Sequence, residues 1–298
     1  MGILRNFYLY VMQDVKLIEC PRDAMQGIKE WIPTEKKVQY IQALLRCGFD
    51  TIDFGSFVSP KAIPQMQDTA EVLQALDLSQ TESKLLAIVA NLRGAENALA
   101  FPEIDYLGYP FSISENFQMR NTHKTIAQSI QVLEEILALA QSCQKEVVTY
   151  LSMGFGNPYG DPWSVEIVAR WAERLSDMGV RTLSLSDTVG SSTAEVIAYL
   201  FSNLIPRYPN IEFGAHLHTT PSSWFEKVDA AFKGGCLRFD GAIQGFGGCP
   251  MAKDELTGNM PTEKMLSYFT TEKINTHIHT MAFESAHNEA SKIFLKYH

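Results

Sequence analysis

The chain has 298 residues, 46% of them hydrophobic and 20% charged, so it can bury a large core. Its net charge of −9, with no block of Lys or Arg, argues against a nucleic-acid surface but leaves room for an anionic ligand. The five cysteines (20, 47, 143, 236 and 249) form no C-x-x-C pair, which is typical of free thiols in a reducing, cytoplasmic compartment. The apolar stretch at 3–12 is too short for a membrane span, and we interpret it as structure and not as a signal peptide.

Short β-branched runs alternate with helical patterns along the chain. Strands are predicted at 15–20, 50–55, 84–91, 104–111, 146–153, 181–187, 211–218 and 238–245. Helices are predicted at 34–48, 64–77, 94–100, 124–143, 163–179, 192–205 and 222–234.

Eight buried strands that each precede a helix favour a parallel sheet closed into a (β/α)8 TIM barrel over residues 1–260. An open doubly wound sheet is the alternative, but no G-x-G-x-x-G follows the first strand. Residues 261–298 form a surplus helical extension of the same domain, which we expect to cap one end of the barrel.

Polar residues cluster at the predicted strand ends, where barrels of this class build their active sites. Side chains two apart on a strand share a face, so His216 and His218 should point the same way. The other candidates, from four further strand ends, are Arg22, Asp23, Asp53, Asp187, Cys249 and Asn259. A single residue of this kind more often has a structural role, for example as a helix cap or in a turn. Together, however, their number at the strand ends favours an active site.

A carboxylate, two imidazoles and an amide oxygen at one mouth suit a divalent ion. This mixed set of nitrogen and oxygen donors points to Mg²⁺ or Mn²⁺ as readily as to Zn²⁺. The second H-x-H, formed by His277 and His279, lies in the helical tail, where residues two apart diverge, so it predicts no ligand pair.

Six stretches together resemble the 3-hydroxy-3-methylglutaryl-CoA lyases, members of a superfamily of metal-dependent aldol and Claisen barrels. They are ECPRDAMQG, FVSPKAIPQM, SDTVG, HLH, GGCP and TGN, in the family's order from about 15 to 270. FVSPKAIPQM together with GGCP is specific to these lyases. The condensing synthases that make isopropylmalate or homocitrate share the Arg-Asp and H-x-H features but differ at GGCP.

The resemblance implies a role for each candidate residue. The positions that match the family's metal ligands are Asp23, His216, His218 and Asn259. Arg22 matches the arginine that steadies the enolate, and Cys249 matches a catalytic cysteine on a mobile loop. Asp187 matches an active-site aspartate, and Asp53 stands where the family has a glutamate. The chain departs from the family where ECPRDA is one residue shorter than EVGPRDG and where the loop before Asn259 is one residue longer.

The implied reaction is the retro-Claisen cleavage of 3-hydroxy-3-methylglutaryl-CoA to acetoacetate and acetyl-CoA, a carbon–carbon lyase reaction of leucine degradation. It implies Mg²⁺ or Mn²⁺ as cofactor and an acyl-CoA as partner, with neither nucleic acid nor membrane, and leaves a homodimer open. His216 and Asp187 are alternatives for the base, and Cys249 is the expected acid. Two other functions stay open: the same chemistry or a condensation on another 3-hydroxy-3-acyl thioester, and a non-catalytic binding protein.

Overall fold

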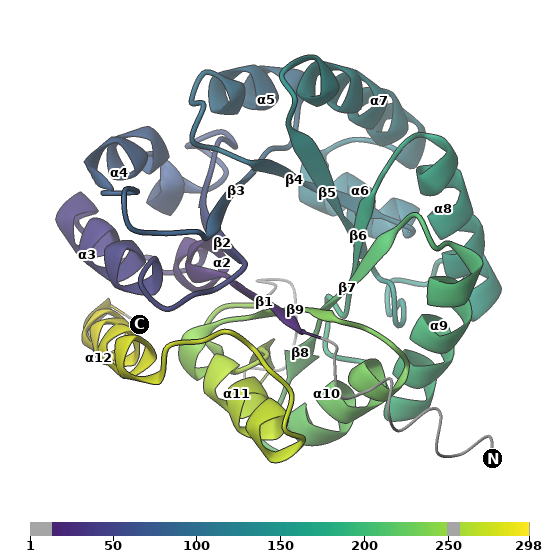
Figure 1. Ribbon diagram of the computed structural model, residues 1–298. Coiled ribbons are helices and arrows are strands. Elements are labelled where there is room, and N and C mark those ends of the chain that lie inside the picture. The colour runs from purple at the N-terminus through teal and green to yellow at the C-terminus, as the bar shows by residue number, and fades with distance from the viewer. Residues whose placement is uncertain (1–13, 249–256, 298) are drawn as a thin grey trace.

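The computed structural model describes residues 14–248 and 257–297, and Cys249 lies outside these described residues. Within them, eight parallel strands form a closed barrel (Figure 1). The strands are β1 (Lys16–Glu19), β2 (Thr51–Ser56), β3 (Lys84–Ile88), β4 (Tyr106–Ser112), β5 (Glu146–Ser152), β6 (Thr182–Ser186), β7 (Glu212–His216) and β9 (Arg238–Gly241). The predicted (β/α)8 barrel is confirmed.

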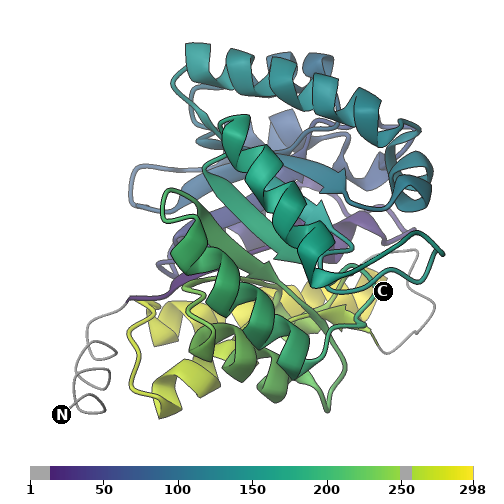
Figure 2. The same cartoon turned by 90° about the vertical axis from the view of Figure 1, so that its right-hand side faces the viewer.

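The helices of the outer layer cover the strands, as the side view shows (Figure 2). Those predicted between the strands are present as α3 (Thr34–Leu44), α4 (Thr69–Ala75), α5 (Leu92–Leu99), α7 (Ile126–Ser142), α8 (Val165–Asp177), α9 (Ala194–Arg207) and α10 (Trp224–Lys233). A 3-10 turn (Pro64–Met66) precedes α4. No helix of the described residues is long and apolar enough to cross a membrane.

Two helices were not predicted. α2 (Pro21–Gln26) has only six residues, too few to show a helical period. α6 (Glu115–Thr122) is mostly polar, and the side chain of Ser114 caps it by accepting a hydrogen bond from the amide of Phe117. Both helices follow a strand directly, so they shape the mouth of the barrel.

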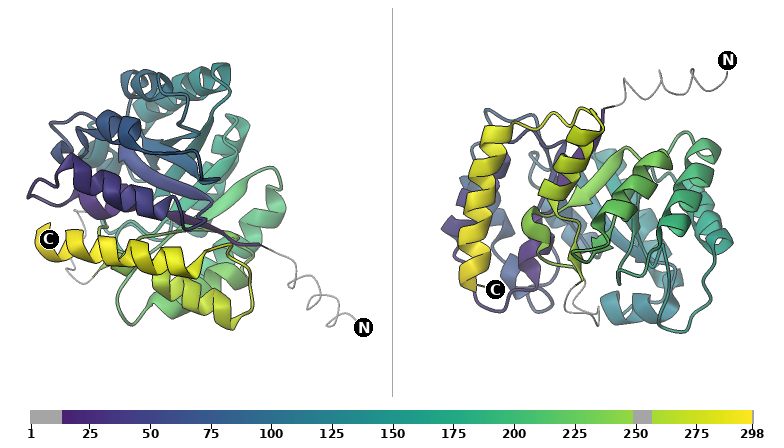
Figure 3. Two further views of the ribbon diagram at one scale, coloured as in Figure 1. Left: turned by 60° about the vertical axis from the view of Figure 1, so that its left-hand side comes forward. Right: turned by 90° about the horizontal axis from the view of Figure 1, so that it is seen from below.

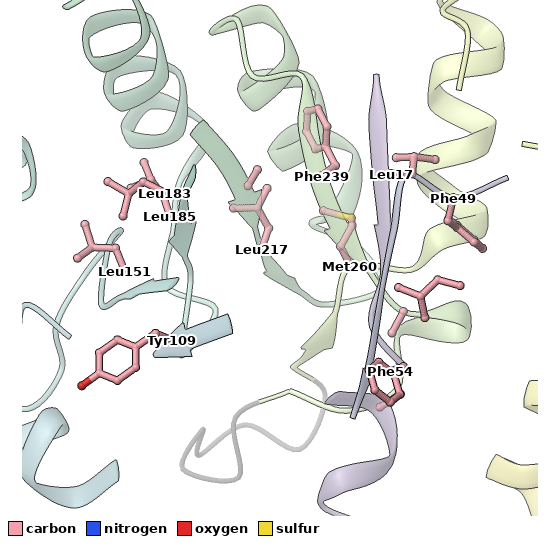
Figure 4. Close-up of a cluster of buried hydrophobic side chains, with 14 of the residues drawn as sticks. Leu17, Phe49, Phe54, Tyr109, Leu151, Leu183, Leu185, Leu217, Phe239 and Met260 are labelled. Atoms are coloured by element: carbon pink, nitrogen blue, oxygen red, sulfur yellow. The ribbon is translucent and has the colours of Figure 1, made fainter. Parts of the chain in front are cut away.

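The main apolar core lies between the strands and the outer helices. Along each strand the side chains alternate, and the outward ones, such as Leu151, Leu183 and Phe239, belong to this core (Figure 4). The inward face is more polar near β6, β7 and β9. Gly214 leaves room there, because a Cβ at this position would lie 3.1 Å from Ser184 Oγ and 3.2 Å from Arg238 Cδ.

The C-terminal tail is helical, as predicted, and forms α11 (Thr262–Thr271) and α12 (Thr280–Tyr297). It does not cover an end of the barrel as we expected but stands in the outer ring, with α12 beside α3 and α11 beside α10 (Figures 1 and 3). The reason is the apolar face of α12. Phe294 packs edge-on against Tyr40 at 6.1 Å between ring centroids, and Phe283 packs against Phe49 at 6.3 Å.

A buried carboxylate joins the barrel to this tail. Glu19 Oε1 accepts a hydrogen bond from the amide of Ile243 at 2.8 Å, and Oε2 accepts one from Thr262 Oγ1 at 2.6 Å. Burial raises the pKa of Glu19 to about 8, although both hydrogen bonds favour the charged form. The folded protein therefore keeps Glu19 protonated in a pH range where the unfolded chain does not.

The stability of the protein should depend on this proton. Because the folded-state pKa of about 8 lies above the ordinary value of 4.5, the unfolding free energy should fall as pH rises through this window, by at most about 5 kcal/mol. Glu19→Gln keeps a neutral acceptor and donor and should flatten this decline in urea unfolding measured from pH 5 to 8. The exposed Glu35→Gln serves as control and should keep the wild-type curve. An unchanged slope in Glu19→Gln would contradict the assignment.

Candidate active site

A cavity of about 340 Å³ opens at the carboxyl ends of the barrel strands. Its polar lining residues include Arg22, Asp23, His216 and His218. Its apolar lining residues include Val58, Ile63, Ile88 and Phe117. This is the end of the barrel at which the sequence predicted the site.

Arg22 and Asp23 reach the cavity from α2, which begins at Pro21 immediately after β1. The Arg22 guanidinium binds Asp53 through Nε, at 3.2 Å from Oδ1 and 3.1 Å from Oδ2, and also through Nη2. Its Nη1 donates to Asp23 Oδ1 at 2.8 Å. Asp53 is fully buried beneath the arginine, so it holds Arg22 in place and does not itself line the described cavity.

Asp23 is held from several sides. Gln26 Nε2 donates to its Oδ1 at 2.6 Å, and Asn259 Nδ2 donates to its Oδ2 at 2.7 Å. Burial by itself would raise the pKa of Asp23, but the charge of Arg22, with His216 and His218, holds that pKa below its ordinary value. Asp23 is therefore an ionised carboxylate at neutral pH.

The two histidines of the H-x-H motif lie next to each other, with ring centroids 5.4 Å apart. The predicted strand 211–218 is divided, because β7 ends at His216 and His218 begins β8 (His218–Thr219). β8 pairs antiparallel with β10 (Gly258–Asn259), and in this register Asn259 is opposite His218. The short second sheet thus brings Asn259 to the same end of the barrel as the histidines.

The hydrogen bonds of the two rings define which nitrogen is available. His218 Nδ1 lies 3.1 Å from the carbonyl oxygen of Thr188, which can only accept, so Nδ1 carries the proton. His218 Nε2 is buried and has no hydrogen-bond partner among the residues that the structure describes. Burial, followed by the charge of His216, lowers the pKa of His218 to about 4, so the ring is neutral at pH 7.

His216 is paired with a buried carboxylate. Its Nδ1 lies 3.0 Å from Asp240 Oδ2. Burial by itself would lower the pKa of His216, but the hydrogen bond and the charge of Asp240 raise it above the ordinary value. Because Nδ1 of His216 is bound to Asp240, Nε2 is the nitrogen of this ring that can contact a ligand.

These residues fit a divalent ion. One ligand atom from each of Asp23, His216 and His218 lies within 4.8 Å of the others. An ion there would occupy the lone pair of His218 Nε2, a buried atom that is otherwise costly to leave without a partner. Cys20, His216 and Asp240 form a second group of this size, but His216 Nδ1 and Asp240 already bind each other within it.

The structure does not bring every predicted site residue to the cavity. Asp187 follows β6, but its carboxylate accepts hydrogen bonds from Lys227 Nζ at 2.7 Å and from Ser192, and it is absent from the described lining of the cavity. Sequence reasoning missed Lys227 and Asp240. An ionisable residue in the buried strand 238–241 was a signal for Asp240, whereas Lys227 sits among ordinary helix residues.

A parallel (β/α)8 barrel with such a group of ionisable residues at its carboxyl mouth is the architecture of an enzyme. Residues 14–289 match the HMGL-like family model, and the chain therefore belongs to this family.

The similar proteins and structures carry related names. The hydroxymethylglutaryl-CoA lyase YngG of Bacillus subtilis is 33% identical over 87% of this chain and 85% of its own length. A 3-hydroxy-3-isohexenylglutaryl-CoA/hydroxy-methylglutaryl-CoA lyase of Pseudomonas aeruginosa is 32% identical over 91% of this chain and 90% of its own. The crystal structure of an HMG-CoA lyase from Acinetobacter baumannii with coenzyme A and 3-methylmalate has a TM-score of 0.86 at 29% identity, covering 94% and 90% of the two chains.

Removing Asp53 should destabilise the fold, because it leaves the buried Arg22 guanidinium without its main partner. We expect Asp53→Ala to lower the unfolding free energy by about 3 kcal/mol in urea denaturation. The matched control is Glu173→Ala, which breaks an exposed pair with Arg207 at 3.3 Å and should cost less than about 1 kcal/mol. Equal losses in both variants would show that Asp53 does not balance a buried charge.

Proposed function

We propose that this enzyme is a divalent-metal-dependent carbon–carbon lyase that cleaves 3-hydroxy-3-methylglutaryl-CoA to acetoacetate and acetyl-CoA. The observation that carries the proposal is the grouping of Asp23, His216 and His218 beside the Arg22 guanidinium, in a chain of the HMGL-like family. The test is direct: the purified enzyme is supplied with the substrate and Mg²⁺, and acetoacetate is measured.

The proposed ligands of the ion are Asp23, His216, His218 and Asn259. The amide nitrogen of Asn259 already donates to Asp23 Oδ2 and to the carbonyl oxygen of Phe246, which leaves the amide oxygen for the ion. Carboxylate, imidazole and amide donors suit Mg²⁺ or Mn²⁺, which we propose as the cofactor, and they also suit Zn²⁺. When bound, the ion acidifies the tertiary hydroxyl of the substrate and fixes its orientation.

In the reaction, the hydroxyl loses its proton while the neighbouring carbon–carbon bond breaks. The electron pair of that bond moves into the thioester, which becomes the enolate of acetyl-CoA, and the remaining fragment is acetoacetate. Arg22 lines the cavity and carries a positive charge that Asp53 and Asp23 hold in place. We assign to Arg22 the stabilisation of the negative charge on the thioester oxygen, which appears only as the bond breaks.

Of the two candidates for the base, His216 is the better placed. It lines the cavity, and Asp240 at Nδ1 would stabilise the ring after Nε2 takes a proton. Asp187 is bound to Lys227 and does not face the described cavity. A nitrogen that holds an ion cannot accept a proton in the same complex, so we assign the role of base to His216 only for a site in which Asp23, His218 and Asn259 hold the ion without it.

The acid that protonates the enolate carbon remains Cys249, as the sequence predicts; this residue lies outside the described structure. The chain before it runs against α2. At Gly247, φ is +85° and a Cβ would lie 2.5 Å from the carbonyl oxygen of Asp23, so only glycine fits. The segment that leads to Cys249 therefore passes the proposed metal ligand.

A second candidate function keeps the chemistry but changes the substrate. The apolar lining residues Val58, Ile63 and Phe117 could contact a larger substituent on C3 than a methyl group. The Pseudomonas aeruginosa relative is named for both a larger and a smaller substrate of this type. The ratio of kcat/KM for the methyl substrate and a longer 3-alkyl homologue decides between the two.

The setting of the enzyme is also proposed from its chemistry. We propose a cytoplasmic location, because the four described cysteines, Cys20, Cys47, Cys143 and Cys236, are free thiols. A place in leucine degradation is proposed from the reaction itself. We assign residues 261–298 to the same domain as residues 1–260, because α12 packs on α3. Light scattering of the purified protein tests for the homodimer that the resemblance leaves open.

Activity should require the ion. Removal of divalent ions with a chelator should abolish acetoacetate formation, and Mg²⁺ or Mn²⁺ should restore it. Asp23→Ala should weaken Mn²⁺ binding, because it removes the only carboxylate among the proposed ligands. The exposed Asp77→Ala serves as control and should bind Mn²⁺ as the wild type does. Full activity after verified metal removal would refute the metal-dependent reaction.

Substitution of Arg22 should separate binding from chemistry. If Arg22 acts on charge that develops in the transition state, Arg22→Met should lower kcat by about 100-fold or more and change KM much less. Steady-state kinetics on the metal-loaded enzyme measures both. A large rise in KM with kcat intact would mean that Arg22 only anchors the substrate.

A further inference from the structure

Lys227 is a buried cation that the proposed reaction does not use. It lies on α10 and is only 2% exposed. Its ammonium group donates hydrogen bonds to Asp187 Oδ2 at 2.7 Å, to the carbonyl oxygen of His218 at 2.8 Å and to that of Gly190 at 3.1 Å. All three of its hydrogens are used, so this one group joins α10 to the segments after β6 and β7.

The partner of Lys227 is itself fixed by its neighbours. Asp187 Oδ1 accepts from the amide of Ser192 at 3.0 Å, and Oδ2 accepts from Ser192 Oγ at 2.5 Å. The amide of Asp187 donates to the carbonyl oxygen of His216 at 2.9 Å. The loop after β6 is therefore tied to the end of β7 as well as to α10.

This network touches His218 at two places. Lys227 holds the carbonyl oxygen of His218, and Asp187 precedes Thr188, whose carbonyl oxygen receives the proton of His218 Nδ1. The position of the His218 ring is thus fixed in two ways: Lys227 holds the backbone of His218, and the Thr188 carbonyl oxygen accepts the proton of its Nδ1. If the Thr188 carbonyl moved away, the proton could shift to Nε2, and the buried lone pair of Nε2 would be lost.

We propose that Lys227 is a positioning residue of the active site, which holds His218 in the tautomer and orientation that present Nε2 to the ion. The proposal rests on the metal site of the proposed function. It also assigns Asp187 to positioning, as the counter-charge of Lys227, in place of the catalytic role that the sequence implied. Groups that orient a metal-binding histidine in this way typically change metal affinity by about 10- to 100-fold when removed.

A purely structural role is the competing explanation, and the chain offers a matched example of one. Lys37 is also 2% exposed, and it donates to Asp68 Oδ1 at 2.7 Å and to the carbonyl oxygen of Gln65. This pair joins α3 to the segment before α4 and does not line the cavity in the described part of the chain. Both pairs should support the fold, but only Lys227 should affect the histidine.

The test compares two double variants. Lys227→Met alone leaves a buried aspartate without a counter-charge and is expected to unfold the protein, so the informative variant is Asp187→Asn with Lys227→Met. The matched control is Asp68→Asn with Lys37→Met. Mn²⁺ binding to the metal-free proteins is measured by electron paramagnetic resonance of the free ion. We expect the first variant to bind Mn²⁺ about 10- to 100-fold more weakly and the control to bind it as the wild type does.

A second measurement does not depend on any metal. Nitrogen NMR of the metal-free protein, with the His218 signal assigned by its loss in His218→Gln, should show the Nδ1–H tautomer in the wild type and in the control. The Asp187→Asn, Lys227→Met variant should show exchange between the two tautomers. Unchanged Mn²⁺ affinity and an unchanged tautomer in this variant would overturn the proposal. If the wild type itself bound no Mn²⁺, the proposed metal site would fail, and the tautomer would still decide the role of Lys227.

Discussion

The pairing of β1 with β9 closes the barrel, and the site depends on that closure. Four residue pairs, from Lys16 with Arg238 to Glu19 with Gly241, join the first barrel strand to the last. Because the strands are parallel, the segments that follow them emerge side by side. This is how Asn259 comes within 2.7 Å of Asp23, 236 positions earlier in the chain. An open sheet of the same strands would leave these two residues at opposite edges.

Closure of the barrel also buries charged side chains, and burial removes them from water at a cost in free energy. The positions of the aspartates near the site follow from this cost. A buried cation without a partner is expensive, so each one near the site has its own carboxylate. Arg22 has Asp53 and Lys227 has Asp187, while the partly buried imidazole of His216 has Asp240 at its Nδ1. Asp23 differs from these three because it lines the cavity while it contacts Arg22. Asp23 can therefore contact an ion in the cavity, whereas Asp53, Asp187 and Asp240 orient other side chains.

The barrel could be predicted from the sequence because its signals are local. Each strand and each amphipathic helix shows its own period, and the strand ends then define one mouth. The same reasoning predicted that His216 and His218 would face the same way, and their rings are neighbours even though the strand divides after His216.

What the sequence could not reveal are pairings between distant segments. Asp187 and Lys227 are 40 positions apart, and nothing near either residue indicates the other. The aspartate therefore looked available for catalysis until its partner was known. The same holds for the C-terminal tail. The apolar face of α12 predicts that the helix is buried on one side, but it does not indicate which element it packs against.

The place that α12 takes connects it to the site. Gln244, the residue after Ile243 in the turn that follows β9, has a φ of 64° and donates through its side chain to Ser291 Oγ at 2.5 Å. Phe246 stacks on Phe294 with 4.3 Å between ring centroids. The carbonyl oxygen of Phe246 accepts a hydrogen bond from Asn259 Nδ2 at 2.9 Å, and the same nitrogen reaches Asp23. A continuous set of contacts thus leads from the last helix to Asp23. Phe246 and Asn259 therefore connect α12 to Asp23, a proposed ligand of the ion, so changes on the buried face of α12 should alter the mouth of the barrel as well as the stability of the fold.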